Sequence, residues 1–185
     1  PSLTQMTQKA IDILDNNDRG FFLMVESGRI DHGHHASSAY NALTDTIEFS
    51  NAIQAAVDST NPSETLIIVT ADHGHVFTIA GYPKRGNPML GKVIYPGADK
   101  YALAADGMPY TTLGYANGPG FHDFSAQANE QGLHSLGSVT DADTVYGAEL
   151  FMGRADLSAV DTQSSGFHQE SSVPMRSETH SGEDV

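Results

Sequence analysis

The sequence predicts an α/β protein, because two apolar runs of strand length flank a long segment with helical periodicity. The runs cover residues 21–25 and 65–69, and neither alternates between polar and apolar positions, which is typical of strands buried on both faces of a parallel sheet. Apolar residues between the runs recur at helical intervals. We therefore expect a β-α-β unit with a right-handed crossover.

Both expected helices have recognisable ends. Ser2 and Gln5 have the spacing of a capping box, and the turn-forming residues 16–20 stop the first helix before the first apolar run. The second helix begins at about His35 and ends at residues 58–62, which include a proline. The first helix thus leads into the first strand, and the second helix connects the two strands.

The chain divides into three parts by composition. Residues 1–77 hold the expected β-α-β unit of an α/β domain. Residues 78–175 are punctuated by glycine and proline turn signals, and we expect a loop-rich excursion with only a weak helical pattern at 140–152. Residues 176–185 return to the same sheet edge. The chain begins without Met and ends on entering an apolar segment, so we expect it to be truncated at both ends.

Charge and composition exclude several classes of function. The formal net charge of −14 argues against a nucleic-acid-binding surface, which needs a basic face to follow phosphates. The sequence has no cysteine, so any metal must be bound by His, Asp or Glu. None of the apolar runs approaches the roughly 20 residues of a membrane-spanning helix.

Carboxylates and imidazoles follow the first apolar run, where an open α/β sheet places its ligands. Asp31 and His35 are four residues apart, so on a helix they lie on one face, within roughly 6 Å, and can reach one ion. A carboxylate with imidazoles suits Zn²⁺, and His180, in a polar turn near the end of the chain, is our candidate third ligand. The same spacing also fits a helix N-terminus with an acidic cap and surface histidines.

Two further ligand positions follow the apolar runs. Asp72 and His73 come directly after the second run, where a turn can make adjacent side chains converge, although an Asp that caps the next element gives the same pattern. Glu26 ends the first run, and a carboxylate there suits Mg²⁺. Two ions about 3.5–4 Å apart can clamp the oxygens of an in-line displacement, so hydrolysis of a phosphate ester is the leading reaction class.

Three segments resemble the metal-binding motifs of alkaline phosphatase, namely residues 21–35, 69–77 and 177–185. Shorter likenesses at 81–87 and 115–120 extend the resemblance to about residues 1–90, 112–120 and 170–185. Residues 121–169 occupy the place of the variable crown-like insertion of this family. The resemblance implies part of a three-layer α/β/α sheet, in which 1–77 belong to the catalytic domain, 78–175 form the crown-like insertion and 176–185 return to the metal site.

The resemblance implies a homodimeric phosphomonoesterase with two Zn²⁺ ions and one Mg²⁺ ion. It would release inorganic phosphate from small phosphomonoesters through a phosphoserine intermediate, and family members are exported, which implies a periplasmic or secreted location. The implied ligands are Asp31, His35 and His180 for the first zinc, Asp72 and His73 for the second, and Glu26 for magnesium. His32, His34 and His75 are expected behind these ligands or on the surface.

The nucleophilic serine and the phosphate-binding arginine of this family precede the strand that begins here at Phe21. Ser59 follows an aspartate as the family nucleophile does, but it lies at a helix end and not in a strand-to-helix turn. No catalytic residue is therefore expected within these 185 residues, and the isolated fragment is expected to be inactive.

Three other functions remain open at this point. A related metal-dependent phosphodiesterase or sulfatase could share the same sheet edge and ligands. An iron oxygenase with two histidines and one carboxylate could use Asp31, His35 and His180, but it leaves Asp72, His73 and Glu26 unexplained. A non-catalytic acidic metal-binding module would fit the missing nucleophile and the net charge.

Overall fold

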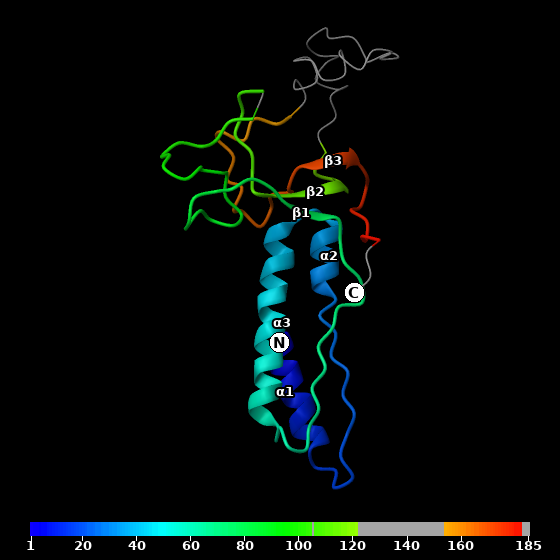
Figure 1. The fold of residues 1–185 in the computed structure, drawn as a ribbon. Helices are drawn as coiled ribbons and strands as arrows, with labels where there is room; N and C mark the ends of the chain where they lie inside the picture. The colour runs from blue at the N-terminus through cyan, green and yellow to red at the C-terminus, as the bar shows by residue number, and fades with distance from the viewer. Residues whose placement is uncertain (105, 122–153, 183–185) are drawn as a thin grey trace.

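The computed structural model describes residues 1–104, 106–121 and 154–182, which fold as a mixed α/β structure (Figure 1). In these residues the helices are α1 (Leu3–Leu14), α2 (Arg29–His35) and α3 (Ala39–Ser59). The strands are β1 (Phe77–Ile79), β2 (Leu113–Gly118) and β3 (Ser171–Pro174). The predicted α/β class is therefore confirmed in outline, with helices and a small sheet in one chain.

Helix α1 confirms the first predicted helix and its capping box. The Ser2 hydroxyl accepts from the Gln5 N–H at 3.3 Å, and the Gln5 side chain accepts from the Ser2 N–H at 3.1 Å. These two bonds satisfy amide groups that the first helical turn leaves without partners. The helix packs against α3, and the Thr4 N–H donates to the Glu48 carboxylate of that helix at 2.9 Å. Helix α1 thus packs along one side of the longer helix α3.

The second predicted helix is confirmed as α3, but it begins at Ala39 and not at about His35, because a separate short helix, α2, precedes it. Ser37 has a φ of 53°, in the left-handed region, so the chain turns between the two helices. An ideal Cβ on Gly33 would lie 2.6 Å from the backbone nitrogen of Ala42, so α2 approaches α3 closely only because residue 33 lacks a side chain. The break therefore lets α2 pack against α3.

The predicted strands at 21–25 and 65–69 are also corrected, since the structure assigns no strand to either run. Both runs lie alongside the helices and lead toward α2 (Figure 1). Among the described residues no backbone hydrogen bond joins them, and Phe22 and Leu66 are 90% and 83% exposed. An extended segment becomes a strand only when a neighbour pairs with its amide and carbonyl groups. The runs have strand composition without such a neighbour here.

The observed sheet lies near the α2 end of α3 (Figure 1). Its order is β1-β2-β3. Strands β1 and β2 are antiparallel, with Phe77 opposite Tyr115, whereas β2 and β3 are parallel, with Tyr115 opposite Ser171. An isolated bridge between His75 and His180 continues the contact beyond the strands. The sheet therefore brings the chain before β1 next to the chain after β3, and both approach α2.

Strands β2 and β3 fall within 78–175, and loops connect the remainder that the structure describes. Arg154 connects these loops by ion pairs. Its guanidinium nitrogens lie 2.6 Å from the Asp106 carboxylate and 2.8 Å from the Glu170 carboxylate. The crown-like insertion stays a prediction, and the weak helical pattern at 140–152 lies outside the described residues. Within the described ranges no helix is both long and apolar enough to cross a membrane.

Candidate metal centre

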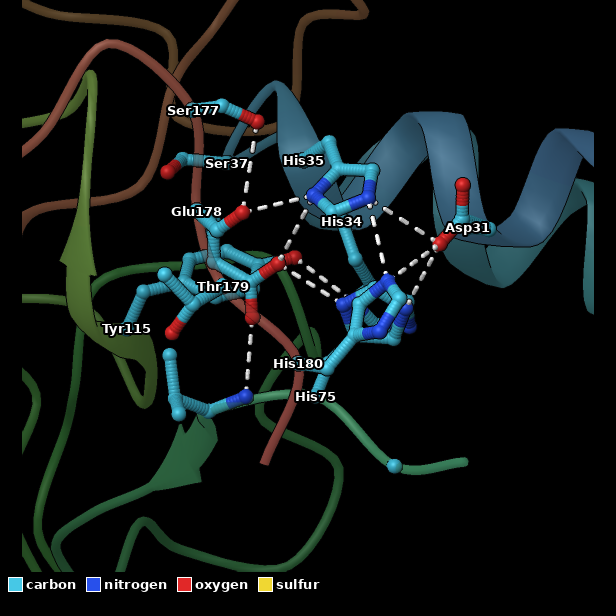
Figure 2. A network of polar contacts seen from close by, with 12 residues as sticks. Asp31, His34, His35, Ser37, His75, Tyr115, Ser177, Glu178, Thr179 and His180 are labelled. Atoms are coloured by element: carbon cyan, nitrogen blue, oxygen red, sulfur yellow. Dashed lines mark hydrogen bonds and ion pairs between the residues drawn. The ribbon is translucent and has the colours of Figure 1, made fainter. Parts of the chain in front are cut away.

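The candidate site begins on α2, which presents Asp31 and His35 on one face. These residues are one helical turn apart, and Asp31 Oδ1 lies 3.2 Å from His35 Nε2 (Figure 2). About a third of each side chain is exposed, so the pair faces an open site. The predicted i, i+4 pairing therefore occurs, although the helix that carries it is separate from α3.

His180 joins this pair from the other end of the chain. Its Nε2 atom lies 3.2 Å from Asp31 Oδ1 and 3.2 Å from His35 Nε2. One carboxylate oxygen and two imidazole nitrogens therefore form a triangle with equal sides of 3.2 Å. Ligands about 2.0 Å from a tetrahedral zinc ion are about 3.3 Å apart, so the triangle matches three corners of such a site.

Two more histidines approach Asp31. His75 Nε2 lies 3.3 Å from Asp31 Oδ1, and His73 Nε2 lies 3.9 Å from the same oxygen. The His73 ring stacks on His180 with ring centroids 3.5 Å apart. Asp31, His73, His75 and His180 thus form one group of side chains that could hold a metal ion.

Glu178 completes a second such group, with His35 and His75. Its carboxylate is buried, and Oε2 lies 2.7 Å from His75 Nδ1 and 3.6 Å from His35 Nδ1 (Figure 2). The Glu178 carbonyl oxygen also lies 2.6 Å from His35 Nδ1. His35 and His75, which each face Asp31 with Nε2, are therefore held by Glu178 through Nδ1.

Asp72 and Glu26 lie outside both groups of potential ligands in the described residues. The Asp72 side chain is 89% exposed, and its carboxylate contacts the neighbouring His73 ring at 3.4 Å. Glu26 is exposed at the end of its apolar run. The structure thus brings together four of the six predicted ligands, namely Asp31, His35, His73 and His180.

The remaining histidines of α2 differ in their surroundings. His32 is exposed, whereas His34 lies 2.9 Å from the Tyr115 hydroxyl and stacks on His75. Burial, with the nearby His75, lowers the pKa of His34 to about 4, so its ring is neutral at pH 7. Burial, with the charge of Glu178, raises the pKa of the Tyr115 hydroxyl. His34 and Tyr115 therefore form a neutral support beneath the cluster.

Asp31 supplies negative charge at the centre of the cluster. Partial burial opposes ionisation of its carboxyl group, but His35, His75 and His180 outweigh that effect and hold its pKa below the ordinary value. An ionised carboxylate among several imidazoles is a donor set that suits Zn²⁺.

The whole chain, residues 1–185, matches the family model described as Alkaline phosphatase. The chain belongs to the alkaline phosphatase family. It is 40% identical to the tissue-nonspecific isozyme of alkaline phosphatase from Gallus gallus over all 185 residues, and 41% and 40% identical to the isozymes from Felis catus and Homo sapiens. The chain covers 30%, 29% and 29% of these relatives, so it spans less than a third of their length.

Family membership agrees with the resemblance found in the sequence, but the structure adds residues that the sequence left without a specific role. Glu178 lies within a recognised motif and had no assigned function, and His75 was expected behind the ligands or on the surface. One signal was available: Glu178 and His180 are two residues apart, so in an extended segment they point to the same side. Tyr115 had no comparable signal, because its contact with His34 joins segments 81 residues apart.

Proposed function

We propose that the protein is a phosphomonoester hydrolase that releases inorganic phosphate, and that this chain contributes most of its metal ligands. Membership of the alkaline phosphatase family and the names of the relatives support this activity. The observation that carries the proposal is the equal-sided triangle of Asp31 Oδ1, His35 Nε2 and His180 Nε2. These three ligands hold the first Zn²⁺ and leave a fourth position open, as catalytic zinc sites do.

His73 and Asp72 hold a second Zn²⁺ in this proposal, and Glu26 contributes to a Mg²⁺ site. The position of His73 beside His180 and Asp31 supports a second ion close to the first. When bound, such ions stabilise the charge on a transferring phosphoryl group and activate water near neutral pH.

The chain's own residues prepare the site for this chemistry. Asp31 keeps a negative charge at the centre of the site. It balances part of the charge of the bound metal ions, and their open side remains available to a phosphate. The packing of α2 against α3 fixes the direction of Asp31 and His35, and the bridge between His75 and His180 fixes the third ligand. Groups that are held in place in this way lower the entropic cost of bringing the reacting groups together.

The remaining parts of the proposal concern the whole protein. The reaction proceeds through a phosphoserine intermediate, and the serine and the phosphate-binding arginine come from outside these 185 residues. The substrates are small phosphomonoesters, and the intact protein is a homodimer with a periplasmic or secreted location. Family resemblance supports each of these statements.

The test measures bound metals and turnover of the natural protein together. We expect zinc by elemental analysis and release of phosphate from 4-nitrophenyl phosphate, with activity lost after chelation and restored by Zn²⁺ and Mg²⁺. Asp31→Ala and His180→Ala should each lower zinc content and turnover strongly, since each removes one corner of the triangle. His32→Ala is the matched control, because His32 is exposed and lies outside the candidate groups.

The result also separates the proposal from its alternatives. Preferential hydrolysis of bis(4-nitrophenyl) phosphate or 4-nitrophenyl sulfate would identify a phosphodiesterase or a sulfatase instead. A protein that contains a single iron, or one that binds zinc without any hydrolytic activity, would refute the phosphomonoesterase proposal.

A further inference from the structure

Glu178 is a buried carboxylate that contacts two histidines of the cluster (Figure 2). Its side chain has no exposed surface, so its two oxygens need hydrogen-bond partners within the protein. Oε1 accepts from the Val76 N–H at 2.8 Å, and Oε2 accepts from the His75 ring at Nδ1 at 2.7 Å. Both oxygens therefore have a donor, and the carboxylate is held in one orientation.

The backbone of Glu178 holds the other histidine. Its carbonyl oxygen accepts from His35 Nδ1 at 2.6 Å, and its N–H donates to the His35 carbonyl oxygen at 2.9 Å. Gly118, with a φ of 141°, leaves room for this arrangement, because an ideal Cβ there would lie 3.2 Å from the Glu178 Cβ. Glu178 thus forms hydrogen bonds both with α2 and with the segment before β1.

These contacts decide which nitrogen of each ring carries hydrogen. A carbonyl oxygen can only accept, so His35 carries hydrogen on Nδ1, and a carboxylate oxygen, which also accepts, places the hydrogen of His75 on Nδ1. When a ring carries hydrogen on Nδ1 alone, its Nε2 has a free lone pair. These two Nε2 atoms lie 3.2 Å and 3.3 Å from Asp31 Oδ1, so each can share a cation, a proton or a metal ion, with that carboxylate.

We propose that Glu178 is a positioning residue that fixes His35 and His75 with hydrogen on Nδ1, so that both rings present an unprotonated Nε2 to a cation beside Asp31. Glu178 acts through the two rings and does not itself bind the ion, because the ring nitrogens that it faces carry hydrogen and its second oxygen is taken by Val76. Groups that orient ligand histidines in this way raise the affinity of metal sites. This inference rests on the proposed metal-dependent function and assigns a new residue to it.

Glu178→Gln gives the sharpest test, because glutamine has the same shape but only one acceptor oxygen. The Val76 N–H cannot change its role, so the amide oxygen stays with it and the amide NH₂ faces His75 Nδ1. That nitrogen must then accept, which moves the ring hydrogen to Nε2, opposite Asp31. In the natural protein we expect zinc affinity to fall about 10- to 100-fold, measured by competition with a chromophoric chelator.

Two further readouts separate positioning from a general loss of structure. The low-field proton NMR signal of the His75 Nδ1–H should disappear in Glu178→Gln, while the far-ultraviolet circular dichroism spectrum stays unchanged. In a His75→Ala background, Glu178→Gln should lower zinc affinity much less than it does alone, because it acts through that ring. Glu170→Gln is the matched control, since the Glu170 carboxylate pairs with Arg154 and not with the cluster.

The outcomes distinguish this inference from the function on which it rests. Zinc affinity of Glu178→Gln within about twofold of the parent, or additive losses with His75→Ala, would overturn the positioning role and leave the phosphatase proposal standing. A parent protein that binds no zinc would refute the proposed function itself.

Discussion

Substitution of Gly33 by alanine should displace the proposed ligands Asp31 and His35, because Gly33 lies between them on α2 and sets how closely α2 approaches α3. The new Cβ would lie 2.6 Å from the Ala42 nitrogen and 2.9 Å from its Cα, whereas ordinary contacts begin at 3.4 Å. The shortfall of about 0.8 Å cannot be relieved by a side-chain rotation, since both opposing atoms belong to the backbone. Helix α2 must therefore move away from α3.

The expected magnitude combines two opposing effects. Overpacking a tight contact costs about 1–3 kcal/mol, and replacing glycine by alanine within a helix returns about 0.5–1 kcal/mol. We expect a net loss of about 0–2.5 kcal/mol, centred at about 1 kcal/mol, in the stability of the α2–α3 contact. The same shift displaces Asp31 and His35 together, and a site of this kind tolerates only about 0.5 Å of displacement. Zinc affinity should therefore fall at least about tenfold.

The assay compares zinc affinity and the thermal unfolding midpoint of the natural protein and the Gly33→Ala variant. Gly166→Ala is the matched control, because an ideal Cβ there has no contact closer than 3.8 Å and its φ is not in the left-handed region. The control should change neither quantity. If Gly33→Ala binds zinc as tightly as the parent and unfolds at the same temperature, the close approach of α2 does not set the ligand geometry and the reasoning is wrong.

Two other predictions concern contacts away from the metal centre. Lys92 is buried and donates to backbone carbonyls within residues 157–160, at 2.7 Å for the shortest bond, so Lys92→Met should leave them unpaired and lower stability by about 1–3 kcal/mol. Faster limited proteolysis at 157–160 would show this, and an unchanged cleavage rate would contradict it. The hydrogen bond from the Thr4 amide lowers the pKa of Glu48 from 4.5 to about 2. This stabilisation is present above about pH 4.5 and is lost as the pH falls toward about 2, so protection of the Thr4 amide from hydrogen exchange should fall over that range in the parent and not in Glu48→Gln.

Signals carried by neighbouring residues were enough to predict α1 and the pairing on α2. Ser2 and Gln5 satisfy each other's amides, and Asp31 and His35 lie on one helical face, whatever the rest of the chain does. The break at Ser37 was missed because a left-handed φ at a residue other than glycine leaves no clear pattern in the neighbouring sequence.

Contacts between distant segments could not be predicted in the same way. The run at 65–69 has the composition of a buried strand, yet a strand also needs a partner, and the described residues supply none. Conversely, β3 is a four-residue strand in a polar segment, and it forms because β2 pairs with it. The role of Glu178 depends on the same long-range pairing, since its histidine partners lie 103 and 143 residues away.

The same distinction explains why the predicted ligands fall into two sets. Asp31, His35 and His180 are attached to elements that have partners, because α2 packs on α3 and His180 forms a bridge with His75. These three converge at zinc-like spacing. Glu26, Asp72 and His73 follow the apolar runs, which lack backbone partners in the described residues. His73 reaches the cluster because its ring stacks on His180, but neither carboxylate joins it. Pairing of the runs would fix the direction in which these carboxylates leave the sheet edge. We therefore expect the proposed second zinc site and magnesium site to need β-pairing of residues 21–25 and 65–69, whereas the proposed first zinc site rests on contacts within the described residues.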